Sequence, residues 1–237
     1  MFWIRNPLKQ TKFANLKLTK EQRKFIKFAL AGNNVLVDAC IGSGKTTSIQ
    51  CLCDLIPKEK QILYLTYNRL LKLDAQEKIT NPNVHVQNYH GYALERLKEK
   101  GVQVARADLI HAFNRKKLSL PPIDVLIIDE YQDIDTQIAS MLQYIKSCYP
   151  TIQIIMVGDM QQKIYNYTSL DVEKFVSDFI KVHETVHFTT CFRLSKEWAN
   201  NLGTTRKITA NLSHTEENEH RKETNYGSTR SGRTETD

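Results

Sequence analysis

Short apolar runs, separated by helical patterns, constrain the fold of this chain more than any other feature. Each run holds three or four aliphatic, mostly branched residues and is bounded by polar or turn residues. A strand that is apolar along its whole length is buried on both faces, as in a parallel sheet covered by helices. We therefore predict buried strands at Val35–Val37, Ile62–Leu65, Val125–Ile128 and Ile154–Val157, with a fifth at Thr185–Thr189.

Amphipathic helical patterns fill the gaps between these runs. Strands that alternate with helices favour an α/β fold with a mainly parallel sheet flanked by helices. Residues 104–122 are less regular and are interpreted as a small insertion, and a further helix is predicted from Ser195. The predicted helices are Thr19–Leu30, Thr46–Leu55, Leu70–Ile79, Tyr92–Lys98 and Thr136–Ser147.

The first strand leads through a glycine-containing turn into a helix, which is the arrangement of a phosphate-binding loop. Gly42 and Gly44 allow the backbone N–H groups to curl around an anion, and the helix adds its positive end. Lys45 is placed to reach the β- and γ-phosphates of a nucleotide, and the Thr46 hydroxyl to bind Mg²⁺. A chance glycine-rich turn is the alternative. The predicted ATP-binding loop comprises Ala39, Cys40, Ile41, Gly42, Ser43, Gly44, Lys45, Thr46 and Thr47.

Two adjacent carboxylates follow the strand at 125–128. At the carboxyl end of a parallel strand, Asp129 and Glu130 are expected to face the same crevice as the phosphate loop. Asp129 is suited to hold Mg²⁺, directly or through water, and Glu130 to orient and deprotonate a water molecule. Taken alone, such a pair is more often a helix cap; the phosphate loop upstream favours the catalytic interpretation.

The strand at 154–157 also ends in a polar turn, with Gln161, Gln162, Tyr165 and Tyr167. An amide at a strand end can sense a γ-phosphate through a hydrogen bond, and exposed tyrosines can stack on bases. Taken alone, this segment is more typical of a plain turn with core tyrosines.

Together the three segments resemble the superfamily I DNA helicases of the UvrD/Rep/PcrA type. Ala39 matches the Ala-x-x-Gly-x-Gly-Lys-Thr form of that family's phosphate loop, where the generic pattern has glycine. Residues 129–133 match its Asp-Glu-x-Gln-Asp box, and residues 157–165 match its Val-Gly-Asp-x-x-Gln-x-Ile-Tyr box. The resemblance implies that Gln162 senses the γ-phosphate and that Tyr165 and Tyr167 couple the nucleotide state to base stacking.

Shorter matches extend the resemblance over residues 15–203. Gln22 resembles the Q-motif glutamine that reads adenine. Tyr67 and Asn68, and likewise His90, lie in segments similar to motifs Ia and Ib, which contact single-stranded DNA. Residues 191–194 resemble motif IV, which implies that Phe192 stacks on adenine and Arg193 reaches the γ-phosphate.

The resemblance implies an ATP-binding domain, with Mg²⁺ as cofactor and single-stranded DNA as partner, that hydrolyses ATP to move on or unwind DNA when complete. Motifs V and VI of the second RecA-like domain are not found after Leu202. We therefore expect either a truncated or frame-shifted helicase or a standalone ATPase domain, with weak hydrolysis unless a partner protein supplies the missing half-site. A non-catalytic module that binds ATP or single-stranded DNA is the alternative. A kinase or GTPase is disfavoured by residues 129–133 and by the lack of a guanine-reading Asn-Lys-x-Asp motif.

Charge and composition add expectations for the two ends of the chain. Residues 1–27 carry eight basic residues and one acidic residue, which accounts for the whole net charge of +7. A basic segment at 1–14 favours a phosphate-rich partner, although a solvated lysine-rich surface is an equal alternative. The polar tail at 204–237 is predicted to be disordered.

Five cysteines without a disulfide framework suggest an intracellular protein, and no signal peptide or membrane-spanning run is found.

Overall fold

The computed structural model describes residues 16–162, 170–192 and 209–210. The chain divides into two compact units. The first comprises Met1–Ala39 with Gly44–Phe188, and the second comprises Cys40–Ser43 with Thr189–Asp237.

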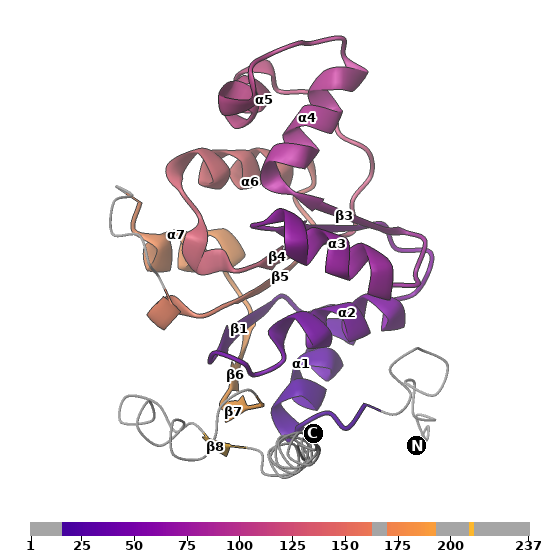
Figure 1. Cartoon of the computed structure of the whole chain (residues 1–237), viewed down its shortest axis with the longest axis vertical. Coiled ribbons are helices and arrows are strands. Elements are labelled where there is room, and N and C mark those ends of the chain that lie inside the picture. Colours follow the sequence, from indigo (N-terminus) through magenta and orange to yellow (C-terminus); the bar gives the residue numbers. More distant parts are fainter. Residues whose placement is uncertain (1–15, 163–169, 193–208, 211–237) are drawn as a thin grey trace, which may run out of the picture. The chain divides into compact units, whose positions relative to one another are not determined.

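The first unit is built on one six-stranded sheet in the order β3-β2-β4-β5-β1-β6 (Figure 1). Every neighbouring pair in it is parallel. All the carboxyl ends of the strands therefore lie at one edge of the sheet, and the segments that follow β1, β2, β3, β4 and β5 begin there. The strands are β1 (Val35–Ala39), β2 (Ile62–Thr66), β3 (Val84–Asn88), β4 (Val125–Asp129), β5 (Gln153–Gly158) and β6 (Glu184–Phe188).

Among the described residues of the first unit, α1 precedes β1 and six further α-helices lie between the strands. Side-chain caps fix where most of these helices begin. Thr19, Asn68, Asn88, Asp135 and Asp171 each accept a hydrogen bond from a backbone N–H of the first turn that follows. The helices are α1 (Lys20–Leu30), α2 (Lys45–Leu55), α3 (Arg69–Lys78), α4 (Tyr89–Glu99), α5 (Leu109–Lys116), α6 (Thr136–Cys148) and α7 (Val172–Ile180). Short 3₁₀ turns occupy Arg106–Asp108, Tyr131–Asp133 and Met160–Gln162.

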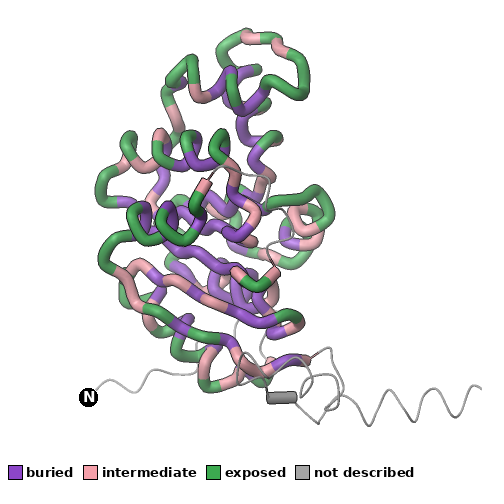
Figure 2. The backbone as a smooth tube through the Cα atoms, turned by 90° about the vertical axis from the view of Figure 1, so that its left-hand side faces the viewer, coloured by how far each residue is buried: buried purple, intermediate pink, exposed green. Residues whose placement is uncertain are grey.

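Two hydrophobic cores, one on each face of the sheet, hold the first unit together. Alternate residues of β4 show the division: Val125 and Ile127 pack with α1, α2 and α3, whereas Leu126 and Ile128 pack with α4, α5, α6 and α7. All residues of β2 and β4 are buried, and Figure 2 shows buried segments in the interior, with exposed residues along the outer turns of the tube. The predicted α/β fold, a RecA-like parallel sheet flanked by helices, is confirmed.

Three elements of the first unit were not predicted. β3 is an edge strand whose residues are mostly half-buried, so it lacks a continuous apolar run. α5 lies inside the segment expected to be irregular. α7 buries Val172, Phe175, Val176, Phe179 and Ile180, a spacing with helical periodicity that the sequence does contain.

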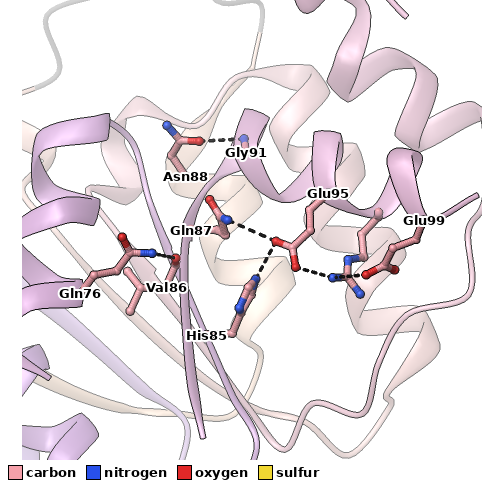
Figure 3. A network of polar contacts seen from close by, with 9 residues as sticks. Gln76, His85, Val86, Gln87, Asn88, Gly91, Glu95 and Glu99 are labelled. Carbon is pink, nitrogen blue, oxygen red and sulfur yellow. Dashed lines mark hydrogen bonds and ion pairs between the residues drawn. The ribbon is translucent and has the colours of Figure 1, made fainter. Parts of the chain in front are cut away.

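A polar network ties α4 to the edge strand β3 (Figure 3). Glu95 accepts hydrogen bonds from His85 at 2.9 Å and from Gln87 at 3.2 Å, and it pairs with Arg96 at 2.6 Å. A Cβ atom on Gly91 would lie 2.4 Å from the Gln87 Oε1 atom, so glycine allows the first turn of α4 to approach the strand. The glycine at position 91 is therefore accounted for by the packing of α4 against β3, without a role in DNA binding.

The second unit contains a short parallel pair, β7 (Thr190–Cys191) and β8 (Thr209–Ala210). β8 falls within the tail that was predicted to be disordered. The rest of that tail, the basic segment 1–14 and the helix predicted from Ser195 lie outside the described residues. Among the helices that the structure describes, none is long and apolar enough to cross a membrane.

Candidate functional site

The phosphate-loop sequence joins β1 to α2, as predicted. Ala39 is the last residue of β1, and Lys45 is the first residue of α2. Gly42 and Gly44 have φ angles of +67° and +78°, a region that side-chain-bearing residues rarely adopt. Gly44 is the N-cap of α2 and contributes no capping side chain, so the first N–H groups of the helix are left for another acceptor. This is the backbone geometry that an anion-binding turn requires.

The part of this loop that falls in the second unit is Cys40–Ser43. Ile41 in it is exposed, whereas Cys40 and Ser43 are buried. The backbone N–H of Phe192 donates to the carbonyl oxygen of Gly42 at 2.9 Å. Within the second unit, the residue predicted to stack on adenine therefore contacts the Cys40–Ser43 part of the predicted phosphate loop.

In the first unit, Lys45 and Glu130 are brought together from α2 and from the end of β4. The Lys45 Nζ atom lies 3.8 Å from the Glu130 Oε2 atom, and the two side chains are largely buried. Glu130 adopts a left-handed conformation, with φ at +56°. Such a conformation in a residue other than glycine is uncommon and often marks a functional position.

Asp129 is fully buried at the end of β4. Its Oδ1 atom accepts a hydrogen bond from the backbone N–H of Glu130 at 3.0 Å, and its Oδ2 atom accepts one from the Tyr64 hydroxyl at 3.0 Å. Burial and the neighbouring charge of Glu130 raise the pKa of Asp129 to about 7, although the Tyr64 hydroxyl and Lys45 act in the opposite direction. Burial, followed by the charge of Asp129, also raises the pKa of Tyr64 well above its ordinary value, so this hydroxyl stays protonated and donates.

This carboxylate suits a divalent cation, because a nearby positive charge would offset the cost of burying it. Carboxylate and hydroxyl oxygens are the ligands that Mg²⁺ prefers, and Asp129 and Thr46 provide them. In the part of the chain that the structure describes, no group of three or more His, Cys, Asp or Glu side chains could hold a metal ion. A cation here would therefore depend on few protein ligands and on phosphate and water, which is the usual mode for Mg²⁺ in nucleotide sites.

Gln132 connects the end of β4 to the end of β5. Its amide nitrogen donates to the Glu130 Oε2 atom at 2.7 Å, and its amide oxygen accepts from the backbone N–H of Asp159 at 2.9 Å. A Cβ atom on Gly158 would lie 2.5 Å from this oxygen, so the contact requires glycine at that position. Sequence reasoning did not assign this role to Gln132 or Gly158.

Gln162, the predicted γ-phosphate sensor, continues the same chain of contacts. Its side-chain amide donates to the Asp159 Oδ2 atom at 2.8 Å, and its backbone N–H donates to the Asp159 carbonyl oxygen at 2.9 Å. An ion pair therefore joins Lys45 to Glu130, and hydrogen bonds continue from Glu130 through Gln132 and Asp159 to Gln162.

Gln22, which was predicted to recognise adenine, helps to cap the N-terminus of α1. Its Oε1 atom accepts from the backbone N–H of Thr19 at 2.9 Å, and the Thr19 hydroxyl accepts from the Gln22 N–H at 3.1 Å. This reciprocal pair is a capping box. A structural role is thus established for Gln22, and adenine recognition stays a prediction.

The residues predicted to contact DNA follow β2 and β3 at the same edge of the sheet as Asp129. Tyr67 is 42% exposed and His90 is also exposed. Asn68 is the N-cap of α3 and accepts from the Leu71 N–H at 2.9 Å. Arg193, Tyr165 and Tyr167, all predicted site residues, lie outside the described residues, so their roles stay predictions.

A comparison with protein families now adds to this geometry. Residues 22–168, which span the phosphate loop and the ends of β4 and β5, match the family described as AAA domain. The chain belongs to this AAA domain family. A comparison with curated proteins gave no match.

Solved structures share the fold of this AAA domain protein. The Pif1 helicase from Candida albicans has a TM-score of 0.52 and 19% identity, over 81% of this chain and 44% of that one. Pif1 from a Bacteroides species in complex with ADP-AlF4 has a TM-score of 0.51 and 20% identity, over 82% of this chain and 47% of that one. The chain thus spans less than half the length of these helicases. At this identity the likeness shows a shared fold, and the resemblance to the UvrD/Rep/PcrA type stays a prediction.

Proposed function

We propose that this chain is the ATP-binding domain of a superfamily I helicase, and that it hydrolyses ATP in a reaction stimulated by single-stranded DNA. The observation that carries the proposal is the approach of Lys45, at the start of α2, to Glu130, at the end of β4. The structure thus brings together a lysine suited to bind phosphate and an acid suited to act on water, although they are 85 positions apart in the sequence.

Each described residue then has a distinct task. The turn around Gly42 and Gly44 surrounds the phosphates with N–H groups, and Lys45 stabilises the charge that develops on the γ-phosphate. Mg²⁺, held by Thr46 and Asp129, would neutralise phosphate charge. Glu130 orients a water molecule and accepts its proton, and Gln132 fixes the direction of the Glu130 carboxylate.

Further residues are assigned by the resemblance. Gln22 and Phe192 would hold the adenine. Gln162 would report on the γ-phosphate, and Arg193 would add positive charge there. An arginine from a second RecA-like domain, in the same polypeptide or in a partner, would complete the site. In related phosphoryl-transfer systems such an arginine raises the rate by about 10³–10⁵.

Single-stranded DNA is proposed to bind across the segments that follow β2 and β3. Tyr67 offers an exposed ring for stacking on a base. Asn68, the N-cap of α3, and His90, in the first turn of α4, offer polar side chains. Tyr165 and Tyr167 would join this surface. The five cysteines form no disulfide in the structure, which supports a proposed reducing, intracellular location.

The test is steady-state ATP hydrolysis by the purified chain, with and without oligothymidylate, for the wild-type and Lys45→Ala proteins. Turnover that DNA stimulates and that the substitution abolishes would support the enzyme. Nucleotide binding without turnover under any condition, including added partner domain, would instead support a non-catalytic binding module. Turnover that survives Lys45→Ala would refute the proposed site.

A further inference from the structure

A buried tyrosine on the neighbouring strand contacts the proposed metal-binding carboxylate. Tyr64 lies in the middle of β2, and its side chain has no exposed surface. Its hydroxyl donates to the Asp129 Oδ2 atom at 3.0 Å. β2 and β4 pair in parallel with Tyr64 opposite Ile127. Asp129 lies two residues beyond Ile127, so both side chains project from the same face of the sheet.

The two hydrogen bonds to Asp129 fix both oxygens of its carboxylate. The backbone N–H of Glu130 holds Oδ1, and the Tyr64 hydroxyl holds Oδ2. A carboxylate can still rotate about its χ2 bond when one oxygen is held, because this torsion is broad. The second hydrogen bond removes that freedom, which leaves the remaining lone pairs in a defined direction.

Packing alone does not explain the hydroxyl. The ring of Tyr64 belongs to the core formed with α1, α2 and α3, where phenylalanine would fill nearly the same volume. A hydroxyl in an apolar core is costly unless it finds an acceptor. In this core the acceptor is the carboxylate at the catalytic edge of the sheet, so the polar atom serves Asp129.

We propose that Tyr64 is a positioning residue, whose hydroxyl orients the Asp129 carboxylate for the Mg²⁺ ion of a bound nucleotide. This inference rests on the proposed function, since it assigns the tyrosine to the same nucleotide site. Hydrogen-bonding partners of metal ligands typically contribute about 10- to 100-fold to metal affinity. Tyr64 therefore raises the affinity of the site for Mg²⁺, and it has little direct influence on phosphate binding by the loop.

The experiment is a Mg²⁺ titration of nucleotide binding by the full chain carrying Tyr64→Phe. Fluorescence of mant-ADP reports binding without hydrolysis, both in EDTA and at increasing MgCl₂. We expect the Mg²⁺ concentration for half-maximal enhancement of binding to rise at least about 10-fold. Affinity for mant-ADP in EDTA should stay at the wild-type value, because the phosphate loop is unchanged.

Tyr144→Phe is the matched control. The Tyr144 hydroxyl donates to the Leu118 carbonyl oxygen at 2.7 Å, so the control also deletes one hydroxyl and one hydrogen bond. Its Mg²⁺ dependence should be that of the wild type. A double-mutant cycle guards against indirect effects: in an Asp129→Asn background, Tyr64→Phe should cause no further shift.

Three results would overturn the inference. They are an unchanged Mg²⁺ dependence in Tyr64→Phe, an equal loss of binding in EDTA, and additive effects of Tyr64→Phe and Asp129→Asn. If the wild-type chain binds mant-ADP but any of these three results is obtained, the proposed role of Tyr64 is refuted and the proposed function is unaffected. If the wild-type chain binds no nucleotide, both proposals are refuted.

Discussion

A methyl group at position 158, the last residue of β5, has no room beside the turn that follows β4. The Cβ atom of Gly158→Ala would lie 2.5 Å from the Gln132 Oε1 atom and 2.7 Å from the Tyr131 Cδ1 atom. Gln132 is buried, and moving its amide breaks the hydrogen bonds to Glu130 and to the Asp159 backbone. The substitution should therefore destabilise the protein and also release the Glu130 carboxylate.

The size of the effect follows from these contacts. Overpacking costs about 1–3 kcal/mol, and the disturbed hydrogen bonds add about 1 kcal/mol or more. We expect the free energy of unfolding to fall by about 3 kcal/mol, which lowers Tm by about 6–12 °C for a domain of this size. Thermal unfolding followed by circular dichroism measures the change.

Two further variants make this prediction sharper. Gly101→Ala is the control, since a Cβ there meets nothing within 4 Å and only the φ of +67° is unfavourable; its cost should be about 1 kcal/mol. Gly158→Ala should cost about 1 kcal/mol less in a Gln132→Ala background, because one obstacle is gone. A Gly158→Ala protein within about 0.5 kcal/mol of the wild type would refute the steric reasoning.

Other predictions concern catalysis and DNA binding. Glu130→Gln should bind ATP normally and release phosphate about 10²- to 10⁴-fold more slowly in single-turnover experiments. Tyr67→Ala should weaken binding of fluorescent oligothymidylate about 5- to 150-fold, the equivalent of one lost stacking contact of about 1–3 kcal/mol. Replacing the exposed lysines Lys20, Lys24 and Lys27 of α1 by Gln should lower the slope of log affinity against log salt concentration by about 2, because each phosphate contact to a single strand contributes about 0.7.

Each of these predictions has a contradicting result, and the two on DNA binding also have a control variant. Phosphate release at the wild-type rate would exclude Glu130 as the base. Leu70→Ala is the control for Tyr67→Ala, because Leu70 is 78% exposed and offers apolar surface without an aromatic ring. Equal losses of DNA affinity in both variants would rule out stacking. The control for α1 replaces Lys98, Lys100 and Lys117, and an unchanged slope in the α1 variant would make those lysines ordinary surface.

The central strands of the fold were predictable because they are buried on both faces. Val125–Asp129 reads as a continuous apolar run that ends in a carboxylate, and it forms β4. The edge strand β3 was missed for the opposite reason. His85 and Gln87 face partly outward and take part in the network with Glu95, so Val84–Asn88 lacks the apolar signature.

The candidate site was predictable only where a local motif carries it. The segments around Lys45 and Asp129 match residue patterns typical of phosphate- and metal-binding motifs, so they can be recognised along the chain. Tyr64 and Gln132 act through contacts across strands, and nothing in the adjacent sequence marks them. Their partners, Asp129 and Asp159, are 65 and 27 positions away. α7 could have been found, because its apolar residues keep helical spacing.

Nucleotide binding by the wild-type chain, compared with Lys45→Ala, tests the central claim most directly. Isothermal titration calorimetry with ATP and MgCl₂ measures it without dependence on hydrolysis, DNA or a second domain. The structure predicts saturable binding of one ATP by the wild type and at least about 10-fold weaker binding by Lys45→Ala, since a charge-assisted hydrogen bond to phosphate contributes about 1.5–3 kcal/mol. No binding by the wild type, or equal affinity in the two proteins, would contradict the account.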